Sequence, residues 1–224
     1  MKNFVVFDLD GTLIDTLTGL TEAVNVTLKE LNLPYSYKRD EVMTFIGRGA
    51  KRLFNLATKN ENNPAEFALF LKNYEKNQYI SEPYDHVLET LKELEKRNIS
   101  LIIYSNKPNN ILNKLVENKL NKINFLHVQG QDNNYPPKPD VTLLKSILNK
   151  FNLKPEDGLY VGDSIVDIET ARNIKMKVAI LSYGYGNKEE IKEAKPDYYL
   201  DDFKEILDVL WQKKKSYYLD YIAI

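Results

Sequence analysis

Two carboxylates lie two residues apart near the start of the chain, in the run Asp8-Leu9-Asp10-Gly11-Thr12. They follow the apolar stretch 4–7, which is short and rich in Val and Phe and therefore predicts a buried strand. Such a strand would deliver Asp8 to the carboxyl edge of a sheet, where α/β proteins bind their ligands, and Gly11 would permit a sharp turn there. The run indicates chemistry by carboxylates, although an acidic loop after a core strand has the same pattern.

Further polar residues follow predicted strands or lie in the loops between them: Ser105, Asn106, Lys138, Asp163 and Asp167. Each has a plain structural explanation when it is taken alone, because Ser and Asn favour turns, Lys is usually solvated and Asp caps helices. Taken in this order, these residues supply acids, a cation and a hydroxyl group at or near the ends of neighbouring strands of the predicted sheet. We expect these side chains to converge on Asp8 at one edge of the sheet.

The composition is that of an ordinary soluble globular protein. The chain has 224 residues, 43% hydrophobic and 28% charged, with a formal net charge of −1, so charge gives no reason to expect nucleic acid or a membrane as partner. The absence of cysteine excludes disulfides, zinc–thiolate sites and Cys nucleophiles. The N-terminal residues lack the features of a signal peptide and no apolar run has membrane-spanning length, so we expect a cytoplasmic protein.

The predicted elements fall into two groups. Residues 17–81 contain no convincing strand and predict helices at 20–31, 39–45, 50–58 and 64–79. From residue 84 onward helices and strands alternate, with helices predicted at 86–97, 110–118, 141–151, 165–173 and 203–210, and strands at 101–104, 124–128, 159–161, 178–181 and 198–200. This alternation is typical of an α/β protein with a doubly wound, Rossmann-like parallel sheet.

We therefore expect an α/β core with an inserted α-helical cap domain. The core would comprise residues 1–14 and 82–212, and the cap residues 15–81. Residues 213–224 are basic and then aromatic, which favours a tail that packs against the core or frays. The two histidines, His86 and His127, lie in separate segments, and we expect structural roles for both.

The motifs, in this order and on these elements, resemble all four signature motifs of the haloacid dehalogenase superfamily, most of whose members are phosphatases. The resemblance implies that Asp8 is the nucleophile and a metal ligand, and that Asp10 is the general acid and base and a backbone ligand of the metal. It implies that Asp163 is a side-chain metal ligand, while Asp167 orients waters or pairs with Lys138. Dehalogenases of the superfamily lack the second Asp, so Asp10 argues against dehalogenation.

Phosphoryl transfer gives these roles a physical reason. With no Cys and no paired Ser and His, a carboxylate is the remaining nucleophile, and Mg²⁺ suits the space between it and an anionic phosphate. Ser105 and the backbone of Asn106 would donate hydrogen bonds to phosphate oxygens, and Lys138 would neutralise charge. Gly11 and Thr12 would allow the backbone to approach the phosphate and would brace the loop, with Thr12 more structural than catalytic.

The stretch 45–50 stands out within the predicted cap, because two glycines flank Arg48 between helical segments. It resembles the corresponding cap loop of phosphoglycolate phosphatases, and in that reading Arg48 binds the carboxylate of the substrate. A solvated Arg in a turn fits equally well. The loop 182–186 also resembles, weakly, a loop of these phosphatases, and a Gly-bearing turn is the simpler interpretation.

The resemblance implies a Mg²⁺-dependent phosphomonoester hydrolase that acts on a small phosphorylated metabolite through an aspartyl phosphate, with 2-phosphoglycolate as the leading candidate. A phosphosugar mutase resembling β-phosphoglucomutase, an inorganic pyrophosphatase and a nucleotidase fit the same core. A phospho-accepting receiver domain does not fit, because here the candidate nucleophile follows the first strand and a helical block comes directly after it. The sequence leaves monomer and homodimer open.

Overall fold

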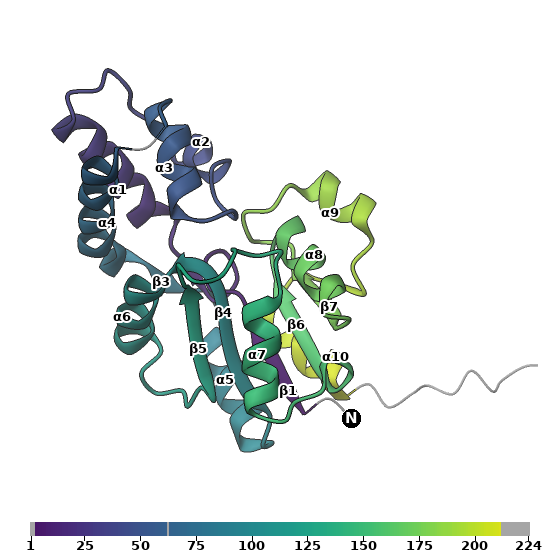
Figure 1. The fold of residues 1–224 in the computed structure, drawn as a ribbon. Helices are drawn as coiled ribbons and strands as arrows, with labels where there is room; N and C mark the ends of the chain where they lie inside the picture. Colours follow the sequence, from purple (N-terminus) through teal and green to yellow (C-terminus); the bar gives the residue numbers. More distant parts are fainter. Residues whose placement is uncertain (1–2, 62, 212–224) are drawn as a thin grey trace, which may run out of the picture.

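A computed structural model describes residues 3–61 and 63–211 of the chain (Figure 1). The predicted tail, residues 213–224, lies outside the described residues. Among the described residues no helix is both long and apolar enough to cross a membrane.

A six-stranded parallel sheet forms the centre of the molecule, with the strand order β5-β4-β1-β6-β7-β8. The strands are β1 (Phe4–Phe7), β4 (Ser100–Pro108), β5 (His127–Gln131), β6 (Gly158–Gly162), β7 (Lys177–Leu181) and β8 (Tyr198–Leu200). β1 lies between β4 and β6 and is completely buried, as its unbroken apolar run predicts. This topology confirms the predicted α/β fold with a doubly wound parallel sheet.

Helices cover both faces of the sheet (Figure 1). On one face α5 (Val87–Lys96), α6 (Asn109–Lys119) and α10 (Ile206–Trp211) pack against Val5 and Phe7. On the other face α7 (Thr142–Lys150), α8 (Ile165–Asn173) and α9 (Lys188–Ala194) pack against Phe4 and Val6. Alternate residues of β1 therefore enter opposite halves of the core, which fixes the position of its carboxyl end.

The remaining helices form a separate unit that projects beyond one end of the sheet (Figure 1). It comprises α1 (Leu17–Glu30), α2 (Arg39–Met43), α3 (Ala50–Thr58) and α4 (Pro64–Asn77), followed by the 3₁₀ turn η1 (Gln78–Ile80). Its apolar side chains form a third cluster, which Ile111 of the core helix α6 joins. Two short strands, β2 (Ile14–Asp15) and β3 (Glu82–Pro83), pair antiparallel where the chain enters and leaves this unit. The sequence did not predict this pair, because two residues are too few to show a period.

Two strands have bounds that differ clearly from those predicted, and one helix was not predicted. β5 occupies residues 127–131 rather than 124–128, because this edge strand is polar and half-buried and shows no apolar alternation. β4 continues past Tyr104 to Pro108 with an irregular register, so that Ser105 and Asn106 lie within a strand rather than in a turn. α9 was missed, since six of its seven residues are charged or small, and the single buried residue, Ile191, leaves no helical period.

Candidate active site

Asp8 lies directly after β1, at the carboxyl edge of the sheet. Its backbone N–H donates to the Val161 carbonyl at 2.9 Å, and its Oδ1 accepts from the Leu9 N–H at 2.7 Å. Oδ2 lies 3.0 Å from Lys138 Nζ, and the side chain of Ser105 hydrogen-bonds to the same carboxylate. Burial raises the pKa of Asp8 to about 6, although the charge of Lys138 opposes this rise. These contacts hold the carboxyl group of Asp8 in place. Its ionisation remains unfavourable unless more positive charge is bound nearby.

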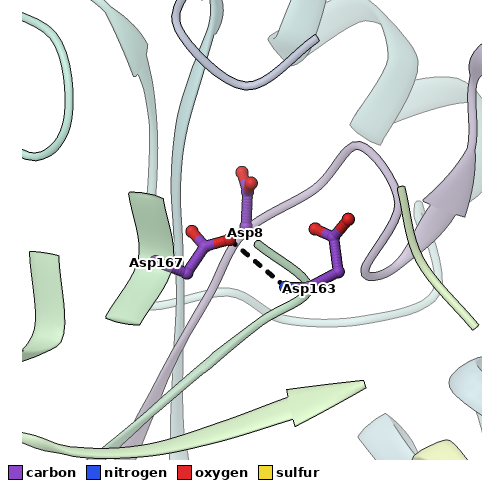
Figure 2. Close-up of side chains that lie close together, drawn as sticks. All are labelled: Asp8, Asp163 and Asp167. Carbon is purple, nitrogen blue, oxygen red and sulfur yellow. Dashed lines mark hydrogen bonds between the residues drawn. The ribbon is translucent and has the colours of Figure 1, made fainter. Parts of the chain in front are cut away.

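Asp163 follows β6 and faces Asp8 across the sheet edge (Figure 2). Its Oδ1 accepts from the Thr12 hydroxyl at 2.9 Å and its Oδ2 from the Tyr185 N–H at 2.7 Å. Burial raises the pKa of Asp163 well above its usual value, and the charges of Asp167 and Asp8 raise it further. The Thr12 hydroxyl is thus a hydrogen-bond partner of the Asp163 carboxylate.

Gly11 permits the close approach of the first loop to this carboxylate. It adopts a φ of +79°, in the region that favours glycine, and a Cβ at this position would lie 2.5 Å from Asp163 Oδ2. A side chain here would therefore displace Asp163. The role predicted from the sequence was backbone approach to a phosphate, and the structure adds this contact with Asp163.

Asp167 lies in the first turn of α8, where it forms a capping box with Ser164. Its Oδ2 accepts from the N–H groups of Asp163 and Ser164, at 3.2 and 3.1 Å, and from the Ser164 hydroxyl at 2.7 Å; the first of these bonds is dashed in Figure 2. Its Oδ1 accepts from Lys138 Nζ at 2.8 Å and from the Tyr160 hydroxyl at 3.4 Å. Of the two functions predicted for Asp167, the structure provides the contact with Lys138.

Lys138 is buried between two acids. Its ammonium contacts Asp8, Asp167 and the Tyr160 hydroxyl, so all three of its N–H bonds have partners. Burial alone would lower the pKa of Lys138, but the charges of Asp167 and Asp8 outweigh this and raise the pKa well above its usual value. Lys138 is therefore a fixed positive charge beside Asp8.

Asn106 secures the backbone that presents Lys138. Its Oδ1 accepts from the Lys138 N–H at 2.7 Å, and its Nδ2 donates to the carbonyls of Lys138 and Gly47, at 3.2 and 3.0 Å. Because Gly47 belongs to the helical unit, the Asn106 side chain connects the two parts of the molecule and is not free for a ligand. The substrate contact predicted for Asn106 concerned its backbone N–H.

The oxygen atoms of Asp8, Asp163 and Asp167 form a set that fits a hard metal cation. One carboxylate oxygen from each lies within 4.8 Å of the others, and all three residues are buried (Figure 2). A donor set of oxygens alone suits Mg²⁺, Ca²⁺ or Mn²⁺ rather than a soft metal. Burial without enough positive charge also explains the raised pKa values of Asp8 and Asp163, which a divalent cation would relieve.

Asp10 has a partner that the sequence did not predict. Its Oδ1 lies 2.9 Å from the ammonium of Lys107, a residue of β4 whose side chain is completely buried. The Lys107 ammonium also donates to the hydroxyl of Tyr74, from α4 of the helical unit. Burial lowers the pKa of Lys107, and the charge of Asp10 counters part of this decrease.

A small cavity of about 80 Å³ joins these groups. Asp8, Asp10 and Asp163 line it from the core, and residues of α1 to α4 and the loop between α2 and α3 line it from the helical unit. Arg48 does not line this cavity: it lines a second, larger cavity of about 690 Å³ beside α8 and α9. Gly47 and Gly49, which flank it, line the first cavity instead.

The residues that the structure places at the site and that sequence reasoning missed include Lys107, Tyr160 and Tyr185. Lys107 follows the predicted Ser105-Asn106 pair, and only its proximity to that pair could have suggested a role. Tyr160 lies in an apolar strand and Tyr185 in a Gly-bearing turn, in a chain with 15 tyrosines. Nothing in such a sequence separates these two from the other tyrosines.

The comparisons with known proteins agree on one family. The family model described as haloacid dehalogenase-like hydrolase matches residues 5–181. Phosphoglycolate phosphatase 1 of Pseudomonas aeruginosa is 32% identical over 92% of this chain and 79% of its own length, and the phosphoglycolate phosphatase of Psychrobacter arcticus is 31% identical over 93% and 96%. The crystal structure of a predicted phosphoglycolate phosphatase from Haemophilus somnus superposes with a TM-score of 0.80 at 31% identity, over 93% of this chain and 97% of that one.

Proposed function

The chain belongs to the haloacid dehalogenase-like hydrolase family and is a phosphatase, and from that premise we propose that it hydrolyses 2-phosphoglycolate with the help of Mg²⁺ through an aspartyl phosphate. The observation that carries the proposal is the convergence of Asp8, Asp10 and Asp163 on one small cavity. Relatives named phosphoglycolate phosphatases support the choice of substrate.

In the first half-reaction Asp8 is the nucleophile. One of its carboxylate oxygens bonds to phosphorus while the bond from phosphorus to the alkoxide oxygen of the substrate breaks. Asp10, in its acid form, gives its proton to that alkoxide, and glycolate leaves. Lys138 and Ser105, both in contact with Asp8, are placed to stabilise negative charge on the phosphoryl oxygens.

In the second half-reaction water releases the phosphate. The Asp10 carboxylate takes a proton from water, the water oxygen bonds to phosphorus, and the bond between Asp8 and phosphorus breaks. Inorganic phosphate leaves, and both carboxyl groups return to their starting protonation states. Bound Mg²⁺, held by Asp8, Asp163 and the backbone carbonyl of Asp10, would reduce the repulsion between the nucleophile and the phosphate.

The helical unit would serve as the cap that excludes water and selects substrates, because it supplies much of the cavity wall. A cavity of about 80 Å³ favours a small substrate over a nucleotide. The chain enters and leaves the helical unit through the β2–β3 pair, and this supports residues 15–81 as the cap, with a hinge at that pair.

The test is phosphate release from 2-phosphoglycolate, β-glucose 1-phosphate, pyrophosphate and a nucleoside monophosphate, with and without Mg²⁺. We expect Mg²⁺-dependent release with a preference for 2-phosphoglycolate, and none from the Asp8→Asn variant. Conversion of β-glucose 1-phosphate into glucose 6-phosphate, with little release from any substrate, would instead identify a mutase.

A further inference from the structure

Lys107 is a buried cation that lines the cavity, and the mechanism proposed above gives it no role in phosphoryl transfer. Its side chain is fully buried, and its ammonium contacts Asp10 and Tyr74. Among the described residues that line the cavity, Lys107 is the only one with a positive charge. Lys138 is not among the residues that line the cavity, and its ammonium already has three partners, Asp8, Asp167 and Tyr160.

Both Lys107 and Tyr74 keep a hydrogen-bond donor for a ligand. An ammonium has three N–H bonds, and within residues 3–61 and 63–211 Lys107 directs two of them to Asp10 and Tyr74 and has no partner for the third. The Tyr74 hydroxyl accepts from Lys107, so its own proton is available, and burial raises the pKa of Tyr74 so that this proton is retained. The Lys107 ammonium also lies 4.2 Å from the centre of the Tyr74 ring, which fixes the pair further.

The position of this pair relative to Asp10 determines which part of a substrate it meets. Asp8 marks the phosphoryl group, and Asp10 marks the oxygen that leaves. Among the described residues Lys107 forms an ion pair with Asp10, at 2.9 Å, and none with Asp8, although the charge of Asp8 also acts on it, so Lys107 lies nearer the leaving-group side. In 2-phosphoglycolate the leaving oxygen is attached to a single CH₂ group, which carries the carboxylate.

We propose that Lys107 and Tyr74 form an anion-binding site for a carboxylate in the leaving group, close to the scissile oxygen. The proposal rests on the phosphatase function proposed above and names its substrate class: phosphomonoesters of short 2-hydroxycarboxylates. Apolar side chains of the helical unit, among them Leu20, Met43 and Leu53, line the same cavity. In such surroundings an ammonium binds a carboxylate far more strongly than it would in water.

This assignment replaces the role expected for Arg48, which lines the second cavity. It also makes recognition depend on both parts of the molecule, because Lys107 comes from β4 and Tyr74 from α4. A substrate carboxylate would therefore bind only when α4 lies against the core as it does here.

The experiment compares 2-phosphoglycolate with ethyl phosphate, which has a methyl group in place of the carboxylate and is otherwise the same at the scissile bond. For each protein the selectivity is the ratio of kcat/KM for the two substrates, measured with Mg²⁺. In Lys107→Met we expect this ratio to fall about 10- to 100-fold, mainly through a higher KM for 2-phosphoglycolate, because a charge-assisted hydrogen bond is lost. The control is Arg48→Met, which removes one positive charge from the second cavity. The selectivity of this variant should stay near that of the wild type.

Several outcomes would overturn the proposal. Equal losses on both substrates in Lys107→Met would mean that Lys107 serves only to position Asp10, and a ratio that falls in Arg48→Met alone would return the carboxylate to Arg48. A wild type that cleaves ethyl phosphate but not 2-phosphoglycolate would overturn the anion site and leave the phosphatase chemistry standing. No release from either substrate would overturn the proposed function, and the anion site with it.

A second variant keeps the test decisive if Lys107→Met does not fold, since that change leaves Asp10 without its partner. Tyr74→Phe removes only one hydroxyl group and retains the ring. We expect its selectivity ratio to fall about 3- to 10-fold. An unchanged ratio in a folded Tyr74→Phe protein would argue against a carboxylate at this site.

Discussion

Lys138 donates a hydrogen bond to Asp167 at 2.8 Å, and this contact holds its ammonium 3.0 Å from Asp8. Asp167 can do this because its other oxygen is fixed by the first turn of α8, where it accepts from three donors. Five hydrogen bonds thus satisfy the two oxygens of Asp167. The carboxylate orients Lys138 and the loop of Asp163, and either of its oxygens would have to give up a hydrogen bond to become the metal ligand that its distance to Asp8 and Asp163 allows.

The first prediction separates these two functions of Asp167. In Asp167→Asn, Lys138 loses its second counter-ion and part of its orientation, so we expect kcat to fall about 10- to 100-fold. The apparent affinity for Mg²⁺ should change much less than in Asp163→Asn. Both quantities come from Mg²⁺ titrations of activity and of Tm. If Asp167→Asn weakens Mg²⁺ binding as much as Asp163→Asn does, Asp167 is a direct ligand of the metal.

The second prediction concerns pH and the metal. Burial raises the pKa of Asp8 to about 6 and that of Asp163 well above its usual value. A carboxyl group with a raised pKa binds protons more tightly in the folded state than in the unfolded chain. Such a group therefore stabilises the folded state fully at pH values below its pKa in the unfolded chain. This stabilisation is lost as the pH rises through its pKa in the folded protein.

We accordingly expect the Tm of the metal-free protein to fall between about pH 5 and about pH 7.5, and to fall less in Asp163→Asn. Mg²⁺ neutralises the same carboxylates, so it should raise Tm more at the higher pH. Differential scanning calorimetry with and without Mg²⁺ measures both effects. A Mg²⁺-induced rise of equal size at the two pH values would show that these carboxyl groups do not titrate in this range.

The third prediction concerns Tyr185, which connects the loop of Asp163 to the entrance of the helical unit. Its hydroxyl accepts from the N–H groups of Thr16 and Leu17, at 2.7 and 3.0 Å, and donates to Asp15 at 2.8 Å. Tyr185→Phe leaves these groups without that partner, and we expect it to lower the free energy of unfolding by about 1–3 kcal/mol in urea titrations. Tyr199→Phe, a change at an exposed position on β8, is the control and should have little effect. Equal stabilities of the two variants would contradict this role for Tyr185.

The elements that could be predicted from the sequence are those with a clear local pattern of apolar and polar residues. The run before Asp8 could be recognised as a buried strand because all of its side chains are apolar, and Asp163 because it ends another such strand. The bounds of the edge strand β5, and helix α9 as a whole, could not be predicted, since each segment buries too few side chains to leave a period in the sequence. Their structure comes from neighbours that are distant in the chain.

The same limit applies to the site. Asp8, Asp10, Asp163 and Lys138 could be predicted from their order and spacing, and the structure brings them together. Lys107 could not, because a lysine in a polar run looks solvated until the fold covers it with α4. Arg48 attracted attention through its flanking glycines, whose positive φ angles turn the loop in a way that no spacing rule predicts.

The last prediction tests whether Thr12 supports the metal site or binds the substrate. Its hydroxyl is completely buried and donates to Asp163 Oδ1 at 2.9 Å, while its carbonyl accepts from the Tyr183 hydroxyl at 2.8 Å. Thr12→Val keeps the shape of the side chain and removes only the donor. Partners of metal ligands typically contribute to metal affinity, so we expect the apparent Kd for Mg²⁺ to rise about 10-fold, with kcat at saturating Mg²⁺ close to that of the wild type. A rise in KM for 2-phosphoglycolate with an unchanged Mg²⁺ dependence would instead mean that Thr12 contacts the substrate.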